Sequence, residues 1–92
     1  MLYIKVEWHH ESALYPVLLY SELDDQRWEC RKVEQFADGR SQFASADAHT
    51  GDTRLGEAPV PTGPEINAQE EFTYHEIDRG EFEALWQAAT DQ

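Results

Sequence analysis

The residues best suited to chemistry begin with two adjacent histidines. His9 and His10 have Glu7 and Glu11 beside them, and imidazoles and carboxylates are common metal ligands. Adjacent residues on a strand point to opposite faces, so both imidazoles reach one ion only if the strand has already ended. No HxH, HxxxH or HExxH spacing occurs anywhere in the chain. We therefore interpret these histidines as surface or turn residues and predict no metal site.

Other candidate chemistry is also weak. Asp47 and Asp52 lie in a glycine-containing segment but lack the alternating ligands and the final glutamate of a calcium loop. No serine has a GxSxG context, and the single cysteine, Cys30, falls in a predicted strand, where a core position is expected. Carboxylates are plentiful, but a chain of 92 residues rarely builds a deep cleft. We predict that the protein is not an enzyme and uses no cofactor.

Four basic residues concentrate around one predicted strand and allow two interpretations. They are Arg27, Arg31, Lys32 and Arg40. Cross-strand ion pairs with Glu22, Asp24 and Asp25 are the favoured interpretation. A small cationic patch that binds an acidic peptide is the alternative. Large aromatic residues pose a similar choice between an exposed platform and the core, and in a small domain the core is favoured. These aromatic residues are Tyr3, Trp8, Tyr20 and Trp28.

The charge balance is strongly acidic and uneven. Nineteen acidic and seven basic residues give a formal charge of −12, and most of the excess lies in the second half of the chain. Nucleic acid and anionic membranes are excluded as partners, because both require clustered Lys and Arg. A basic protein partner would be drawn to the acidic half. The candidate partner-binding residues are Glu57, Glu65, Glu70, Glu71 and Glu76. The alternative is that this charge only keeps the domain soluble.

Targeting signals are not evident. The N-terminus lacks the basic region and the apolar stretch of a signal peptide, and no segment approaches the length of a transmembrane helix. A lone cysteine also provides no disulfide framework. We therefore expect a cytoplasmic protein.

The elements that would position these residues follow from the hydrophobic pattern. Residues 2–8 alternate as a half-buried strand, and further strands are predicted over 17–23, 26–36 and around 43–44. Asp24-Asp25 and Asp38-Gly39 predict the connecting turns. Either a β-bulge near Arg31-Lys32 or a tilted strand that reaches past the core would reconcile the register of the third strand. Residues 2–46 are therefore predicted to form a four-stranded antiparallel meander.

The remainder divides into an irregular segment and a helix. Residues 47–77 are predicted to form a long irregular acidic loop, anchored across the sheet edge by Leu55, Val60 and Ile66. Within it, Thr62 and Glu65 have capping-box spacing, which predicts a helical turn around 64–68. An amphipathic helix is predicted over 78–90, capped by Asp78 and packed on one face of the sheet. The fold class is α+β in a single domain, 1–92.

A resemblance extends over nearly the whole chain. It is carried by residues 3–8, 16–24, 27–34, 38–40, 53–55, 59–61, 65–66 and 81–86. In these segments the chain resembles a family of short, acidic, uncharacterised bacterial proteins, mainly actinobacterial, that constitutes a domain of unknown function. The resemblance implies a small, stand-alone, non-secreted protein and implies no activity, cofactor or site residue.

Three functional hypotheses remain. The first is a non-catalytic cytoplasmic protein-binding domain, immunity-like against a basic toxin or nuclease, by an analogy of size and charge. The second is an accessory or regulatory subunit, or a structural homodimer joined along a sheet edge. The third is a small-molecule sensor or an enzyme, which would require a pocket with converging polar groups.

Overall fold

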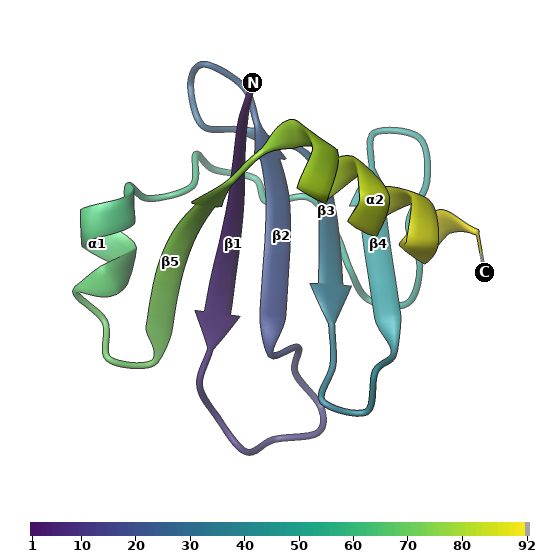
Figure 1. Ribbon diagram of the computed structural model, residues 1–92, viewed down its shortest axis with the longest axis horizontal. Helices are drawn as coiled ribbons and strands as arrows, with labels where there is room; N and C mark the ends of the chain where they lie inside the picture. The colour runs from purple at the N-terminus through teal and green to yellow at the C-terminus, as the bar shows by residue number, and fades with distance from the viewer. Residues whose placement is uncertain (92) are drawn as a thin grey trace.

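The computed structural model describes residues 1–91 and is built on one antiparallel sheet. The sheet has five strands in the order β4-β3-β2-β1-β5 (Figure 1). The strands are β1 (Leu2–Trp8), β2 (Leu18–Leu23), β3 (Glu29–Gln35), β4 (Ser41–Ser45) and β5 (Phe72–Ile77). The helices are α1 (Gly63–Asn67) and α2 (Arg79–Thr90). Helix α2 lies across one face of the sheet, whereas α1 lies beside β5.

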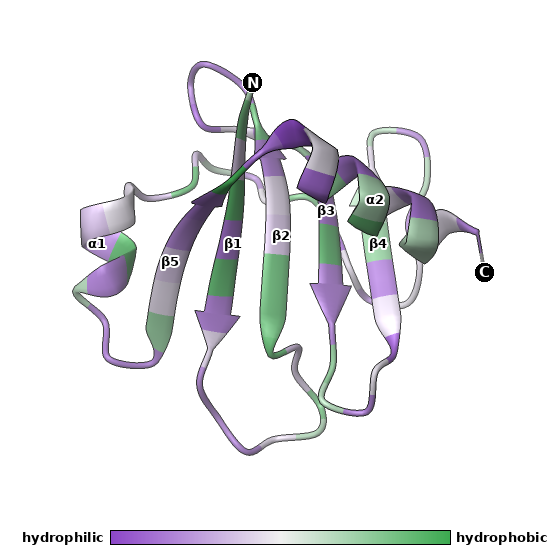
Figure 2. Cartoon of the chain, in the orientation of Figure 1, coloured by the Kyte–Doolittle hydropathy of each residue, from purple (hydrophilic) through white to green (hydrophobic). Residues whose placement is uncertain are grey.

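The first four strands form the meander predicted from the alternating pattern. Each pairs with the next in the chain, beginning with Leu2 of β1 opposite Leu23 of β2. Hydrophobic and hydrophilic residues alternate along β1 (Figure 2). Period-two alternation sends successive side chains to opposite faces, which here are both covered.

The prediction of four strands is wrong by one. Strand β5 lies within 47–77, the segment predicted to be irregular, and pairs with β1 so that Tyr3 is opposite Ile77. Its residues Phe72 and Tyr74 point to one face, but Glu76 continues that row as an exposed acid. The alternation of apolar and polar residues is therefore incomplete. Only part of this edge strand is covered by other elements, so an acid is tolerated at its uncovered end. A chain reversal after α1 is what brings β5 beside β1.

The turns and the bulge lie close to their predicted positions. Glu22 pairs with Arg31 and Leu23 with Glu29, so Cys30 is the extra residue of an irregularity one position before the predicted one. Gly39 has the positive φ expected in the Asp38-Gly39 turn. In the turn after β2, the residue with positive φ is Arg27 rather than either aspartate.

Helix α2 begins and packs as its sequence predicts. The Asp78 carboxylate accepts a hydrogen bond from the Glu81 backbone N–H at 2.7 Å. Phe82 is fully buried, and its ring centroid lies 5.4 Å from that of Tyr3. The core on this face joins the helix to all of the first four strands. Its buried members are Tyr3, Tyr20, Val33, Phe82 and Ala89.

The opposite face of the sheet is covered by α1 and the segment before it. Ile66 of α1 and Val60 of the preceding segment pack against Ile4 and Val6. Two of the three predicted anchors therefore lie on the face of the sheet rather than across its edge. Thr62 and Glu65 form the predicted capping box, and α1 is one residue out of register with the predicted turn.

Arg27 ties this covering segment to the sheet. Its Nε donates to the carbonyl oxygen of Val60 at 2.8 Å, and its Nη2 donates to that of Pro61 at 2.7 Å. The Val60 N–H donates back to the Arg27 carbonyl at 2.8 Å. A left-handed backbone conformation is unfavourable for a residue with a Cβ, and these three bonds stabilise it.

Both edges of the sheet are partly occupied by the chain itself. On β4, the N–H and carbonyl of Phe43 bond the side chain and backbone N–H of Thr50. On β5, the Tyr74 N–H donates to Oδ1 of Asn67 at 2.8 Å. Backbone groups used in this way cannot pair with a strand of another molecule. Neither helix in the described part of the chain has the length and apolar character needed to cross a membrane.

Candidate functional site

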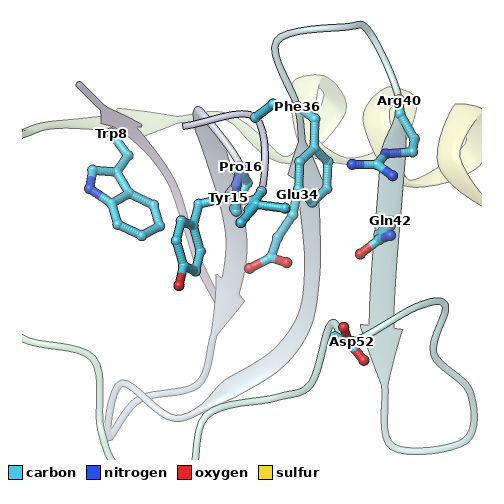
Figure 3. A pocket seen from close by; sticks show the side chains of 10 residues that line it. Trp8, Tyr15, Pro16, Glu34, Phe36, Arg40, Gln42 and Asp52 are labelled. Atoms are coloured by element: carbon cyan, nitrogen blue, oxygen red, sulfur yellow. The ribbon is translucent and has the colours of Figure 1, made fainter. Parts of the chain in front are cut away.

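One hollow is a pocket on the sheet face opposite α2, at the end where β1 and β3 finish. It has a volume of about 490 Å³, and we call it the aromatic pocket. Its main lining residues are Trp8, Tyr15, Glu34, Phe36, Arg40 and Asp52 (Figure 3). They come from β1, β3, the loop that joins β1 to β2, the turn after β3, and the segment after β4. Its size falls within the range of small ligand pockets.

The first wall of the pocket is aromatic and unusually exposed. Trp8 lies with its ring centroid 5.5 Å from that of Tyr15 and 5.8 Å from that of Phe72. Tyr15 is 54% exposed and its neighbour Leu14 is 82% exposed. An exposed aliphatic and an exposed aromatic side chain at the mouth of a pocket are typical of a recognition surface.

His10 holds the loop that carries this wall. The Ser12 N–H donates to Nδ1 of His10 at 3.0 Å, so Nδ1 is the unprotonated nitrogen. Nε2 therefore carries the proton and donates to the Pro16 carbonyl at 2.7 Å. The ring also packs edge-on against Trp8 at 4.6 Å. Both ring nitrogens of His10 therefore bond the backbone of the loop. This agrees with its interpretation as a turn residue.

The floor and the second wall are polar. The hydroxyl of Thr53, a fully covered residue, donates to Oε1 of Glu34 at 2.6 Å and lies 3.0 Å from Oε1 of Gln42. Gly51 makes this arrangement possible, because a Cβ there would lie 2.4 Å from the Gln42 amide. Among residues 1–91, neither Glu34 nor Asp52 has an ion-pair partner within 4 Å. The pocket therefore presents two carboxylates that are not neutralised internally.

Arg40 closes the far side of the pocket. Its guanidinium carbon lies 4.2 Å from the centroid of the Phe36 ring, in a cation–π arrangement. Figure 3 shows Phe36 between Arg40 and Tyr15, with the Glu34 carboxylate below. This pair shows that the pocket already accommodates a guanidinium against an aromatic face.

A second, apolar hollow adjoins the aromatic pocket on the same face. It has a volume of about 310 Å³ and lies between the sheet and α1. Its apolar lining includes Val6, Leu19, Val60, Ile66 and Phe72. The Trp8–Phe72 contact joins the two hollows, and Leu19 is the cross-strand partner of Glu34. The two hollows therefore lie side by side on this face of the sheet.

The five predicted partner-binding glutamates do not form one cluster. Glu65 lies on α1, Glu70 and Glu71 follow it, and Glu76 lies on β5, so these four share the edge of the sheet at β5. Glu57 lies in the segment that runs behind the sheet towards α1. All five are exposed. None lines the aromatic pocket or the apolar hollow.

Three of the four basic residues of the predicted cluster, Arg27, Arg31 and Lys32, bond to other groups of the same chain. Arg31 pairs with Glu22 at 2.8 Å, as the ion-pair interpretation predicts, and also with Glu83 of α2 at 2.8 Å. Lys32 pairs with Glu29 at 3.1 Å. Hydrogen bonding by Arg31 lowers the pKa of both the Glu22 and Glu83 carboxyls, and these bonds raise the pKa of Arg31 itself. Arg40 faces the aromatic pocket, and Lys32 lines the apolar hollow, where it is paired with Glu29.

Two further expectations require correction. Cys30 is half-buried rather than a core residue, because as the extra residue of the irregularity in β3 it has no partner position on β2. Tyr3 and Tyr20 are core residues as predicted, whereas Trp28 is 39% exposed at the opposite end of the sheet from Trp8. The four predicted aromatics therefore form no common platform. No group of three His, Cys, Asp or Glu residues within 1–91 could hold a metal ion.

Several residues that build the aromatic pocket were not predicted as site residues, although Trp8, Arg40 and Asp52 were weighed for other roles. Leu14, Tyr15 and Phe36 were not identified as site residues, and neither was Glu34. One usable signal was the apolar run 13–18 directly after the polar residues 9–12, since a connecting loop rarely carries adjacent exposed large apolar residues. The convergence of Glu34, Asp52 and Arg40 depends on long-range pairing and had no local signal.

Comparison with known proteins places the chain in a family. A family model described as a domain of unknown function (DUF6881) matches residues 2–91. The chain belongs to this family. The resemblance to an uncharacterised family is thus confirmed, whereas the bacterial group that carries the DUF6881 domain stays a prediction. No curated protein and no solved structure matches the chain.

Proposed function

We propose that this DUF6881 protein is a non-catalytic protein-binding domain whose partner is basic, in the manner of an immunity protein that neutralises a basic toxin or nuclease. The observation that supports this proposal is the aromatic pocket, where exposed Leu14 and Tyr15 stand beside the unneutralised carboxylates of Glu34 and Asp52. Aromatic and aliphatic anchors supply contact area, and carboxylates supply complementarity to a basic surface.

The overall charge strengthens this proposal. A formal charge of −12 repels acidic partners and accelerates encounter with basic ones, and the effect decreases with salt. The four glutamates at the β5 edge extend the acidic surface to a second side of the molecule. On this proposal they steer the encounter, while the pocket provides the contacts that persist in the complex.

The test uses a basic partner recovered by crosslinking from the source cells and then purified. We expect Leu14→Asp to weaken its equilibrium binding by at least about tenfold, because a charge replaces an apolar contact in the interface. Trp28→Ala is the matched control, since it removes an exposed aromatic side chain at the opposite end of the sheet. Equal effects of both substitutions, or no effect of Leu14→Asp, would exclude the proposed face.

The homodimer remains the second proposal, but the occupied backbone groups of β4 and β5 leave less edge for strand pairing. Sedimentation equilibrium measures this directly, because an edge-paired dimer dissociates on dilution. The apolar hollow supports the third proposal, a small-molecule sensor. At one end of the hollow, Ser21 and Lys32 both contact the Glu29 carboxylate, so these three side chains are already paired with one another. This pairing favours the protein-binding proposal.

A further inference from the structure

We infer that the aromatic pocket is the anchor site for a single arginine side chain of the partner. This inference rests on the proposed function and specifies which chemistry the partner must present. A guanidinium is planar, so it can stack on an aromatic ring and at the same time donate hydrogen bonds to a carboxylate. The pocket offers both kinds of group within one hollow.

The aromatic side of the anchor site is formed by Trp8 and Tyr15. Their rings are in contact at 5.5 Å, and Tyr15 is more than half exposed, so part of its surface is available to a ligand. Cation–π contacts are stronger when a partner desolvates them than at exposed sites. The pair therefore attracts a cation more strongly once a partner covers it.

The carboxylate side is formed by Glu34, with Asp52 beside it. Thr53 donates to Oε1 of Glu34, and no residue of the described chain donates to its Oε2. The hydroxyl fixes the carboxylate in position, because Thr53 is itself buried. A carboxylate held in this way is ready to accept hydrogen bonds from an incoming donor without a large loss of side-chain entropy.

Arg40 provides an internal comparison. It already stacks on Phe36 at 4.2 Å, on the other side of that ring from Tyr15, and makes no ion pair within 4 Å among the residues described. A partner arginine would therefore occupy the space next to Tyr15 and Glu34. The positive charge of Arg40 repels a second guanidinium. Removal of that charge should therefore strengthen the binding of a partner arginine.

The experiment titrates the full chain with the peptide acetyl-Gly-Arg-Gly-amide and follows the indole N–H signal of Trp8 by NMR. The comparison peptide carries citrulline, which has nearly the same shape as arginine but no charge. We expect arginine to bind with a dissociation constant on the order of millimolar and citrulline about fivefold more weakly. Equal binding of the two peptides, or absence of binding by the arginine peptide, would overturn the inference.

Three variants test the geometry with the same peptide. Glu34→Gln should weaken binding about fivefold, Arg40→Gln should strengthen it about twofold to threefold, and Glu57→Gln should leave it unchanged because Glu57 lies outside the pocket. If Arg40→Gln weakens binding instead, the charge of the pocket does not govern binding of the guanidinium and the inference is wrong. If Glu57→Gln has the same effect as Glu34→Gln, only net charge matters and no anchor exists.

The two levels of the proposal fail in distinguishable ways. If the peptide shows no preference for arginine while Leu14→Asp still disrupts the partner complex, the anchor is wrong and the protein-binding function stands. If the peptide binds as expected while Leu14→Asp leaves the partner complex intact, the pocket binds guanidinium but the proposed interface is wrong.

Discussion

Arg31 of β3 makes a two-point contact with Glu22 of β2. Nε of Arg31 donates to Oε1 of Glu22 at 2.9 Å, and Nη2 donates to Oε2 at 2.8 Å. The same guanidinium carbon lies 5.1 Å from the ring centroids of both Phe82 and Trp86. Tyr3 donates its hydroxyl to Oε2 of Glu22 at 3.1 Å. This network joins the sheet to α2 beneath the helix.

The first prediction concerns the loss of this arginine. Arg31→Met should reduce the free energy of unfolding by roughly 2–4 kcal/mol, because Glu22 would stay buried without its charged partner. The control is Arg79→Met, since Arg79 is exposed and lies 3.8 Å from Glu83, a separation at which surface pairs contribute less than about 1 kcal/mol. Urea denaturation measures both values, and similar losses would contradict the assignment.

The second prediction concerns acid. Arg31 lowers the pKa of Glu22 and Glu83 in the folded state, so these groups stabilise the fold above their ordinary pKa. That stabilisation is lost as the pH falls through the lowered folded values, below about pH 4.3. Glu22→Gln should therefore lower the stability at pH 7 and flatten its further decline between pH 5 and pH 2.

Denaturant titrations at a series of pH values provide the measurement for this variant. The matched control is Glu11→Gln, an exposed carboxyl that takes no part in the network. If the free energy of unfolding of Glu22→Gln declines with acid as steeply as that of the parent protein, the acid sensitivity arises from other carboxyls. The contribution of the Arg31–Glu22 network to that sensitivity would then be smaller than predicted.

The third prediction concerns the helix. Trp86 packs edge-on against Phe43 of β4 with ring centroids 5.3 Å apart, and it stacks on Phe82 at 6.5 Å. Trp86→Ala should cost roughly 3–5 kcal/mol, which approaches the whole stability of a domain of this size. Gln87→Ala on the exposed side of the same helix should change stability by less than about 0.5 kcal/mol. A parent-like thermal melt for Trp86→Ala, or for a chain truncated at Asp78, would show α2 to be an appendage.

The sequence predicted those parts of the fold whose signals are local. The alternation of β1, the Asp38-Gly39 turn and the cap at Asp78 each act within a few residues, and each is present in the structure. Strand β5 was missed because its apolar row, Phe72 and Tyr74, ends in the exposed Glu76 and because its partner, β1, lies about 70 residues earlier in the chain. Its aromatic residues were the only local signal.

The candidate site was less predictable than the fold. The abundance of acidic residues pointed to the second half of the chain, whereas the pocket combines Trp8, Glu34 and Asp52 from three distant segments. Their convergence depends on strand register and on the path of the segment after β4. Burial of Thr53 beneath Glu34 likewise follows from that path, which no periodicity specifies.

The last prediction separates steering by the β5 edge from simple solubility. The steering variant neutralises the four glutamates at that edge, Glu65, Glu70, Glu71 and Glu76, each to Gln. It should slow association with the basic partner severalfold at low salt, and the difference from the parent should shrink as salt rises, because exposed charges are screened over about 8–10 Å at physiological ionic strength. Dissociation should change little, since these residues lie outside the pocket.

A charge-matched control makes this prediction specific to position. It neutralises four exposed acids away from the β5 edge, Glu11, Asp25, Asp47 and Asp91, each to the corresponding amide. Both variants carry the same net charge, so a slower association of the steering variant alone assigns the effect to the β5 edge. Stopped-flow mixing at several salt concentrations measures the rates. Equal association rates for the parent and both variants, at low and at high salt, would mean that the acidic surface serves solubility alone. In that case Glu57→Gln, tested singly, should also leave the association rate unchanged.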